Sequence, residues 1–313
     1  MGARTNQNGT DSWTLSPQAR YIHIDIDSVE VGRNYEALRL VGDAKLPLAA
    51  LSAELAKRDL SRRAAGRPAL SEAIAAALRG WRTKIAGITT DKRAPIQPER
   101  LMADIDRLLT PETIMVADAS YSSIWISNYL TARAVGQRFL TPRGMAGLGW
   151  GLPFAIGAQF AEPDRSVLCV TGDGGFGHCW AELETVVRHQ LPIITVVLNN
   201  QILGYQKHGE TVVFNAYTDA CEFRPVDHAA IARACGCAGV RIEDPADFAP
   251  QLEAALKSRS KRFLTSSSTR TPIRRSHPSG IGFLPRFERR RGTGVQEKTR
   301  IREEKKWQNM KSG

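Results

Sequence analysis

The stretch Val170–His178, VTGDGGFGH, decides the fold of this chain. It follows the apolar run SVLC and precedes WAELETVVRH, so an aspartate among glycines lies where a predicted strand gives way to a predicted helix. A second apolar run, Val196–Asn200 (VVLNN), ends 27 residues after Asp173. Both polar ends follow predicted strands, and parallel sheets bind their ligands at the carboxyl ends of strands.

The rest of the chain alternates strands with helices. We predict strands at residues 21–27, 113–118, 137–142, 166–173, 192–200 and 238–244, and helices at 43–57, 71–87, 94–109, 122–133, 151–161, 178–190, 227–236 and 245–258. Because most of these strands are apolar throughout, the pattern favours an α/β fold with a parallel sheet flanked by helices.

Composition divides the chain into four parts. We predict a small α/β part at residues 1–60, a linker and helix at 61–90, with a broken polar segment near 58–70, and a main α/β domain at 91–262. Residues 263–313 are basic, polar and rich in Ser and Arg, which predicts a disordered tail.

The net charge of +11 is concentrated in this tail. From Lys257 onward there are 17 Lys and Arg against 4 Glu, whereas the remainder holds 26 basic and 28 acidic residues. Since the body of the chain is near neutral, we expect nucleic acid to interact only weakly, through tail electrostatics.

The cysteine content and the apolar runs indicate a cytoplasmic protein. The five cysteines are odd in number and form no C-x-x-C pair, which favours reduced thiols without a metal cage. The N-terminus has no apolar signal core, and no apolar run approaches the roughly 20 residues that a membrane helix needs.

The two polar strand ends predict a metal-bridged diphosphate site. Asp173 offers a carboxylate and Asn200 an amide oxygen, and hard divalent cations such as Mg²⁺ take oxygen ligands from proteins and phosphates. Gly172, Gly174 and Gly175 would let backbone N–H groups approach a phosphate, and a helix starting near His178 would direct its positive end at the anion. The alternative is a tight turn followed by an unrelated helix stop.

A longer pattern resembles a known family. Ile156-Gly157, Pro163 and the run Leu168-x-Val170-x-GDGG, followed by LNN, are similar to the thiamine-diphosphate-binding motif of the acetolactate synthase, pyruvate oxidase and benzoylformate decarboxylase superfamily. The resemblance covers roughly residues 20–262. It implies that residues 1–60 contain the end of the family's middle domain and residues 91–262 its cofactor-binding domain.

The resemblance also assigns roles to residues. Asp173 and Asn200 would bind Mg²⁺ through their side chains and Ile202 through its backbone carbonyl. Gly172, Gly174 and Gly175 would meet the diphosphate. In the turn GMAGLGWG, Ala146 would accept from the aminopyrimidine through its carbonyl, and Leu148 would bend the cofactor, unless Leu148 is ordinary core.

The reaction that the resemblance implies is decarboxylation of a 2-oxo acid, followed by protonation or by addition to a second carbonyl. The cofactor supplies the reactive carbon, and the protein supplies geometry and charge placement. The family's activating glutamate belongs to a domain that precedes the middle domain, so no catalytic residue is assigned here. Intact members hold the cofactor between two chains, which implies a homo-oligomer.

Two departures from the family leave alternatives open. Gly209 stands where acetolactate synthases usually have a tryptophan, so the substrate is open, and Lys207 and His208 are polar candidates or plain helix residues. The tail does not resemble the family's ending, and we hypothesise that a frameshift produced it; the alternative is a genuine basic tail. The chain is then part of a 2-oxo acid carboligase or decarboxylase, a non-catalytic fragment, or a protein that contacts nucleic acid through its tail.

Overall fold

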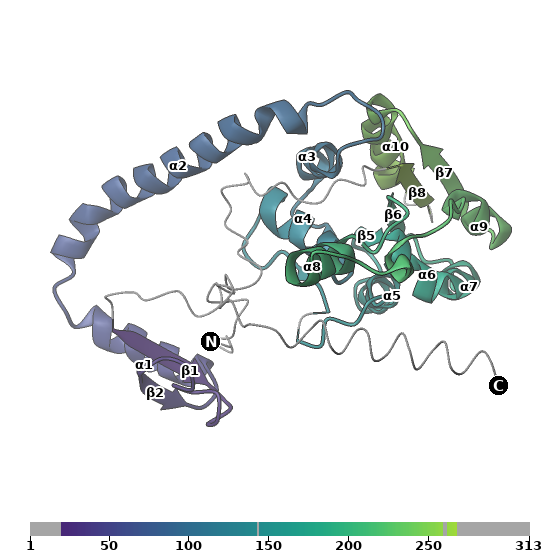
Figure 1. Cartoon of the computed structure of the whole chain (residues 1–313). Helices are drawn as coiled ribbons and strands as arrows, with labels where there is room; N and C mark the ends of the chain where they lie inside the picture. The colour runs from purple at the N-terminus through teal and green to yellow at the C-terminus, as the bar shows by residue number, and fades with distance from the viewer. Residues whose placement is uncertain (1–19, 143, 259–261, 268–313) are drawn as a thin grey trace, which may run out of the picture. The chain divides into compact units, whose positions relative to one another are not determined.

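The computed structural model describes residues 20–142, 144–258 and 262–267 (Figure 1). Contacts divide these residues into two compact units, with the boundary between Pro68 and Ala69. Among them no helix is long and apolar enough to cross a lipid bilayer.

The first unit contains a two-stranded parallel sheet, the helix α1 and the first turns of α2 (Ser61–Thr89). Strand β1 (Tyr21–Asp25) pairs with β2 (Ala37–Val41), and α1 (Lys45–Ala56) follows. The predicted strand at 21–27 is present, whereas β2 was not predicted. The Asp43 carboxylate accepts from the backbone N–H of Lys45 at 2.8 Å, so a side chain does stabilise the start of α1.

The predicted break near residues 58–70 is wrong as a statement about secondary structure. Helix α2 runs without interruption over Ser61–Thr89 and includes Pro68. Ser71 therefore lies inside the helix rather than at its N-terminus. The Ala, Arg and Leu residues around Gly66 and Pro68 favour helix and outweigh the two breakers.

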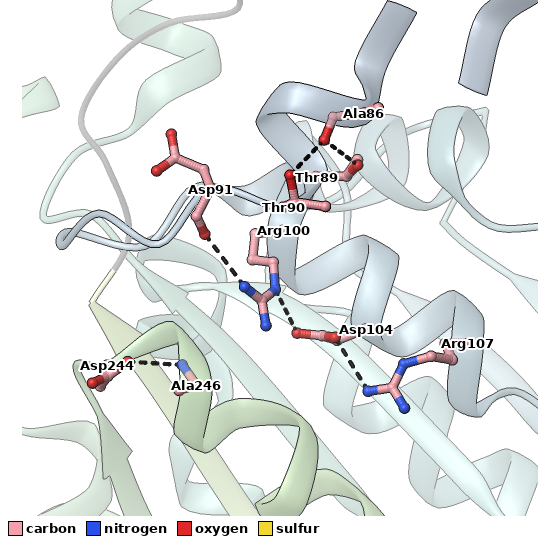
Figure 2. A network of polar contacts seen from close by, with 9 residues as sticks. All are labelled: Ala86, Thr89, Thr90, Asp91, Arg100, Asp104, Arg107, Asp244 and Ala246. Carbon is pink, nitrogen blue, oxygen red and sulfur yellow. Dashed lines mark hydrogen bonds and ion pairs between the residues drawn. The ribbon is translucent and has the colours of Figure 1, made fainter. Parts of the chain in front are cut away.

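Polar contacts join the end of α2 to α3 (Pro98–Leu108), as Figure 2 shows. The hydroxyl groups of Thr89 and Thr90 donate to the Ala86 carbonyl at 3.1 and 2.8 Å, in the last turn of α2. The Arg100 guanidinium donates to the backbone carbonyl of Asp91 at 3.4 Å and to the Asp104 carboxylate at 2.9 Å. These contacts fix the connection that leads into the main sheet.

The second unit is built on a six-stranded parallel sheet with the order β4-β3-β5-β6-β8-β7. The strands are β3 (Ile114–Ala117), β4 (Phe139–Leu140), β5 (Val167–Gly172), β6 (Ile194–Asn199), β7 (Ala238–Ile242) and β8 (Arg262–Ser267). The helices are α3, α4 (Tyr121–Tyr129), α5 (Gly151–Ala161), α6 (Asp173–Cys179), α7 (Leu183–Arg188), α8 (Gly204–Phe214), α9 (His228–Ala234) and α10 (Pro245–Ser258).

Alternate residues of each central strand enter two different cores. In β3, Met115 and Ala117 pack with residues of α3, α4 and α10, whereas Ile114 and Val116 pack with residues of α5, α6, α7 and α9. Successive side chains of a strand point to opposite faces, so a strand covered on both faces must be apolar at every position. The predicted α/β fold, a parallel sheet flanked by helices, is confirmed.

The prediction that the chain is disordered from residue 263 is wrong for its first five residues. Strand β8 spans Arg262–Ser267 and lies between β6 and β7, with Leu264 fully buried opposite Val196 and Val240. The segment RFLTSS is too short and too polar to give an apolar pattern, and its neighbours in the sheet stabilise it. The predicted tail from residue 268 onward, and the frameshift hypothesis, lie outside the described residues.

Candidate functional site

The candidate residues gather at the point where the strand order reverses. From β3 the chain passes to β4 on one side, and then crosses to β5 on the other side. The connections that leave the carboxyl ends of β3 and β5 therefore run in opposite directions along the sheet. Open α/β sheets bind ligands in the crevice that lies between two such connections. Asp118 follows β3, Gly172 ends β5 and Asn200 follows β6.

Asp173 is a buried carboxylate at this edge, with only 5% of its surface exposed. Its two oxygens accept from the backbone N–H of Gly174 at 2.8 Å and of Gln201 at 2.5 Å. Burial raises the pKa of Asp173 to about 6, although these backbone donors act in the opposite direction. No ion pair to Asp173 occurs in the part of the chain that the structure describes.

The loop after β6 brings Asn200 and Ile202 to the same place. Since Asp173 accepts from Gln201, the structure places the carboxylate against the residue that separates Asn200 from Ile202. Gln201 has a left-handed backbone with φ of 59°, and the Asn200 side-chain oxygen accepts from the Ile202 N–H at 3.3 Å. These contacts bring the Asp173 carboxylate to the loop that carries Asn200 and Ile202.

A strap formed by residues 218–223 fixes the orientation of Ile202. Phe223 N–H donates to the Gln201 carbonyl at 2.8 Å, and Leu203 N–H donates to the Cys221 carbonyl at 2.9 Å. These bonds flank the bridge between Ile202 and Glu222. Within the described residues the Ile202 carbonyl itself accepts no hydrogen bond, which leaves it available as an oxygen ligand.

In the glycine-rich turn after β5, the helix begins earlier than the sequence predicted. Helix α6 begins at Asp173, with Gly172 as its N-cap, and not near His178. Glycine is required at two positions for packing: a Cβ on Gly174 would lie 2.5 Å from Leu203 Cδ2, and a Cβ on Gly175 would lie 2.0 Å from Asp118 Oδ2. Gly172, in contrast, faces open space, with no heavy atom within 4 Å of a Cβ position.

Asp118 is a site residue that sequence reasoning missed. Its fully buried carboxylate accepts from the N–H groups of Gly149 and Trp150 at 3.1 and 3.2 Å and from the Thr171 hydroxyl at 2.9 Å. It therefore joins the turn after β4 to the end of β5. The available signal was its place directly after a predicted apolar strand, as for Asp173.

The turn that Asp118 holds contains the two residues assigned to the pyrimidine. Ala146 is exposed and has a left-handed backbone with φ of 54°, a conformation that costs a non-glycine residue roughly 1–3 kcal/mol. Leu148 is half-buried. Both lie in the connection that leads from β4 to α5, beside the strand ends.

The polar candidates on α8 have partners of their own. The Lys207 ammonium forms an ion pair with Glu222 and lies 4.0 Å from the centre of the Tyr217 ring. His208 is half-buried in the same helix. These contacts attach α8 to the strap, which supports the plain helix interpretation of Lys207.

Other features of the described residues lie apart from this site. A cavity of about 280 Å³ lies between α4 and β4, and its lining does not include Asp173 or Asn200. Among the described residues no group of three or more His, Cys, Asp and Glu side chains could hold a metal. A cation at the sheet edge would therefore rely on one carboxylate together with amide, carbonyl and ligand oxygens.

Comparison with known proteins identifies the class. Residues 118–265 match the family model for the C-terminal TPP binding domain of thiamine pyrophosphate enzymes. The chain belongs to the thiamine pyrophosphate-dependent enzyme family, as the resemblance of its motifs implied, and this segment is a TPP-binding domain.

Particular relatives support this assignment. The chain is 30% identical over 263 residues to the acetolactate synthase large subunit of Parasynechococcus marenigrum, which covers 82% of this chain and 41% of that protein. It is 27% identical over 262 residues to the acetolactate synthase isozyme 3 large subunit of Escherichia coli, with 82% and 44% covered. The chain thus spans about two fifths of the length of these relatives.

A solved structure shows the same fold. The thiamine diphosphate-dependent 4-hydroxybenzoylformate decarboxylase of Rhodococcus jostii RHA1 superposes with a TM-score of 0.54 at 23% identity, over 57% of this chain and 34% of that one. At this identity the similarity concerns the fold alone.

Proposed function

We propose that this chain is the thiamine diphosphate- and Mg²⁺-binding part of an acetolactate-synthase-like enzyme that acts on 2-oxo acids. The observation that supports the proposal most directly is the contact between the Asp173 carboxylate and the Gln201 N–H. It joins two motifs 28 residues apart, both inside the segment that matches the TPP-binding domain.

The residues at the sheet edge fit a magnesium diphosphate. A buried carboxylate without an ion-pair partner in the described residues is costly by itself and is stabilised by a cation. The Asn200 amide and the Ile202 carbonyl add oxygen atoms of the kind that Mg²⁺ prefers. Gly174 and Gly175 are in the first turn of α6, where backbone N–H groups favour phosphate oxygens, although the Gly174 N–H also donates to the Asp173 carboxylate.

The chain's own residues would bind and orient rather than transfer protons. Asp173, Asn200 and Ile202 would fix the diphosphate end through the metal, and Ala146 and Leu148 would hold the pyrimidine end. When bound, thiamine diphosphate supplies a carbon nucleophile and an electron sink for decarboxylation of a 2-oxo acid. We expect the activating glutamate to come from another domain or chain, so we assign no catalytic residue.

The experiment is a calorimetric titration of the full chain with thiamine diphosphate, in Mg²⁺ and in EDTA, followed by an assay with pyruvate. Mg²⁺-dependent binding supports the cofactor site. If pyruvate is decarboxylated and the remaining fragment is added to a second carbonyl compound, the result favours a carboligase. Release of an aldehyde favours the alternative, a simple decarboxylase. Binding without turnover favours a non-catalytic fragment, and absence of binding in Mg²⁺ rejects the proposal.

The wider assignments are also proposals. We propose residues 1–60 as the remnant of a middle domain, 61–90 as linker and helix, and 91–262 as the cofactor domain; the division of contacts between Pro68 and Ala69 supports separate parts. By analogy with the acetolactate synthase relatives, we propose a homo-oligomer with a small 2-oxo acid substrate in the cytoplasm.

A further inference from the structure

The turn between α9 and β7 carries a cysteine on each side of a glycine (Figure 1). Cys235 is the C-cap of α9, Gly236 has a left-handed backbone with φ of 87°, and Cys237 directly precedes β7. The Gly236 N–H donates to the Arg233 carbonyl at 2.9 Å, and the Cys237 N–H donates to the Ala232 carbonyl at 2.9 Å. These two bonds define a Schellman motif, which fixes the backbone of the turn.

This turn holds the two cysteines at a separation that a disulfide can span. The Cα atoms of residues two apart lie within about 7 Å of each other, and the bend at Gly236 shortens that distance. Disulfides join Cα atoms that are about 4.4–6.8 Å apart. Both side chains pack against the same apolar core cluster, and both are thiols in the structure. A bond between them therefore requires no movement of another element.

The two thiols differ in their access to solvent. The five cysteines of the chain all lie among the described residues, and four of them are buried, namely Cys169, Cys179, Cys221 and Cys237. Cys235 is half-buried, whereas Cys237 is only 7% exposed. Since the reaction of a thiol with a small oxidant requires access, Cys235 is the point of entry.

We propose that Cys235 and Cys237 are a modification site, at which a low-molecular-weight disulfide oxidises the pair to an intramolecular disulfide. The Cys235 thiolate attacks one sulfur of the small disulfide, whose S–S bond breaks and releases one small thiolate. The Cys237 thiolate then attacks Cys235 Sγ and displaces the second small thiolate. The protons of the two cysteines pass to the released thiolates, so two protein thiols are oxidised and one small disulfide is reduced to two thiols.

The bond should be readily reversible. A disulfide between residues two apart closes a very short ring, and a strained disulfide is easily reduced. An excess of a small thiol should therefore restore both cysteines. The inference does not depend on the proposed function, because the turn contains none of the residues assigned to the cofactor or the metal.

The test is incubation of the folded full chain with oxidised glutathione, followed by acid quenching, alkylation of the remaining thiols in denaturant, and mass spectrometry of tryptic peptides. Cleavage after Arg233 and Arg241 places both cysteines of the turn in one peptide, Ala234–Arg241. The peptide Ser166–Arg188 is a matched internal control, because it carries two buried cysteines, Cys169 and Cys179.

We expect the peptide Ala234–Arg241 to lose two hydrogen atoms and to take up no alkyl group, whereas the control peptide takes up two. Reduced glutathione in excess should reverse the change. Cys237→Ser should stop at a glutathione adduct on Cys235, since the second thiol is missing. Cys235→Ser should react at Cys237 at least about 10-fold more slowly, because that thiol is buried.

The unsubstituted chain decides the question without either variant. A peptide Ala234–Arg241 that keeps both thiols, or that stops at a glutathione adduct, overturns the inference. Equal oxidation of the control peptide also overturns it, since the reaction would then follow opening of the fold rather than the geometry of the turn. Each of these outcomes leaves the proposed function intact, because the assay contains neither thiamine diphosphate nor Mg²⁺.

Discussion

Replacing Asp173 by asparagine should reveal the cost of burying its charge. Burial raises the pKa of this carboxyl from 3.8 to about 6 in the folded chain. Above pH 6 it is ionised both folded and unfolded, and the pKa difference corresponds to about 3 kcal/mol that opposes folding. Below pH 3.8 it is neutral in both states and the opposition disappears.

Asparagine has no such pH dependence, although it also loses one of the two backbone hydrogen bonds that the carboxylate accepts. That loss is about 1–3 kcal/mol and does not change with pH. We therefore expect the free energy of unfolding of Asp173→Asn, relative to the unsubstituted chain, to rise by about 2.5 kcal/mol between pH 4 and pH 7.5.

The assay is urea unfolding of both proteins in EDTA at several pH values between 4 and 7.5, with Asp164→Asn as a control because Asp164 is exposed. A difference in stability that stays constant within about 0.5 kcal/mol across this range would refute the buried-charge reasoning. Adding Mg²⁺ and thiamine diphosphate at pH 7.5 should then stabilise the unsubstituted chain and leave Asp173→Asn unchanged.

Three further substitutions test the packing around the site and in the sheet by their urea midpoints. Gly175→Ala would place a Cβ 2.0 Å from Asp118 Oδ2 and should lose about 2–3 kcal/mol, whereas Gly177→Ala, with no atom within 4 Å, should be neutral or slightly stabilising; equal effects would contradict the geometry. Asp118→Asn should lose about 2–4 kcal/mol because an amide group cannot accept from all the donors that surround the carboxylate, and an unchanged midpoint would argue against its role. Leu264→Ala should lose about 2–5 kcal/mol if β8 is a central strand, and a loss below about 0.5 kcal/mol would show that it is not.

The central sheet could be predicted because its strands are apolar on both faces. Val167–Gly172 and Ile194–Asn199 are continuous apolar runs that end in polar motifs, and such runs occur where helices cover both faces of a sheet. Strands β2 and β8 were missed because ALRLV and RFLTSS are short and partly polar. Their stability comes from neighbouring strands, which a local pattern does not contain.

The sequence could predict those parts of the candidate site that lie at the ends of strands. Asp173 and the residues after Asn200 come together because parallel neighbours end at the same edge of the sheet. The sequence could not indicate that α6 begins at Asp173, since three glycines in its seven residues argue against helix.

The number of hydrogen bonds accepted distinguishes the two carboxylates at this edge. An ionised carboxylate has about four acceptor positions. Asp118 uses them on Ala119, Gly149, Trp150 and Thr171, so its oxygens are saturated by donors from the chain. Asp173 accepts from two backbone N–H groups and retains free positions. A cation that enters this crevice should therefore bind Asp173, while Asp118 holds the turn and the strand end that surround it.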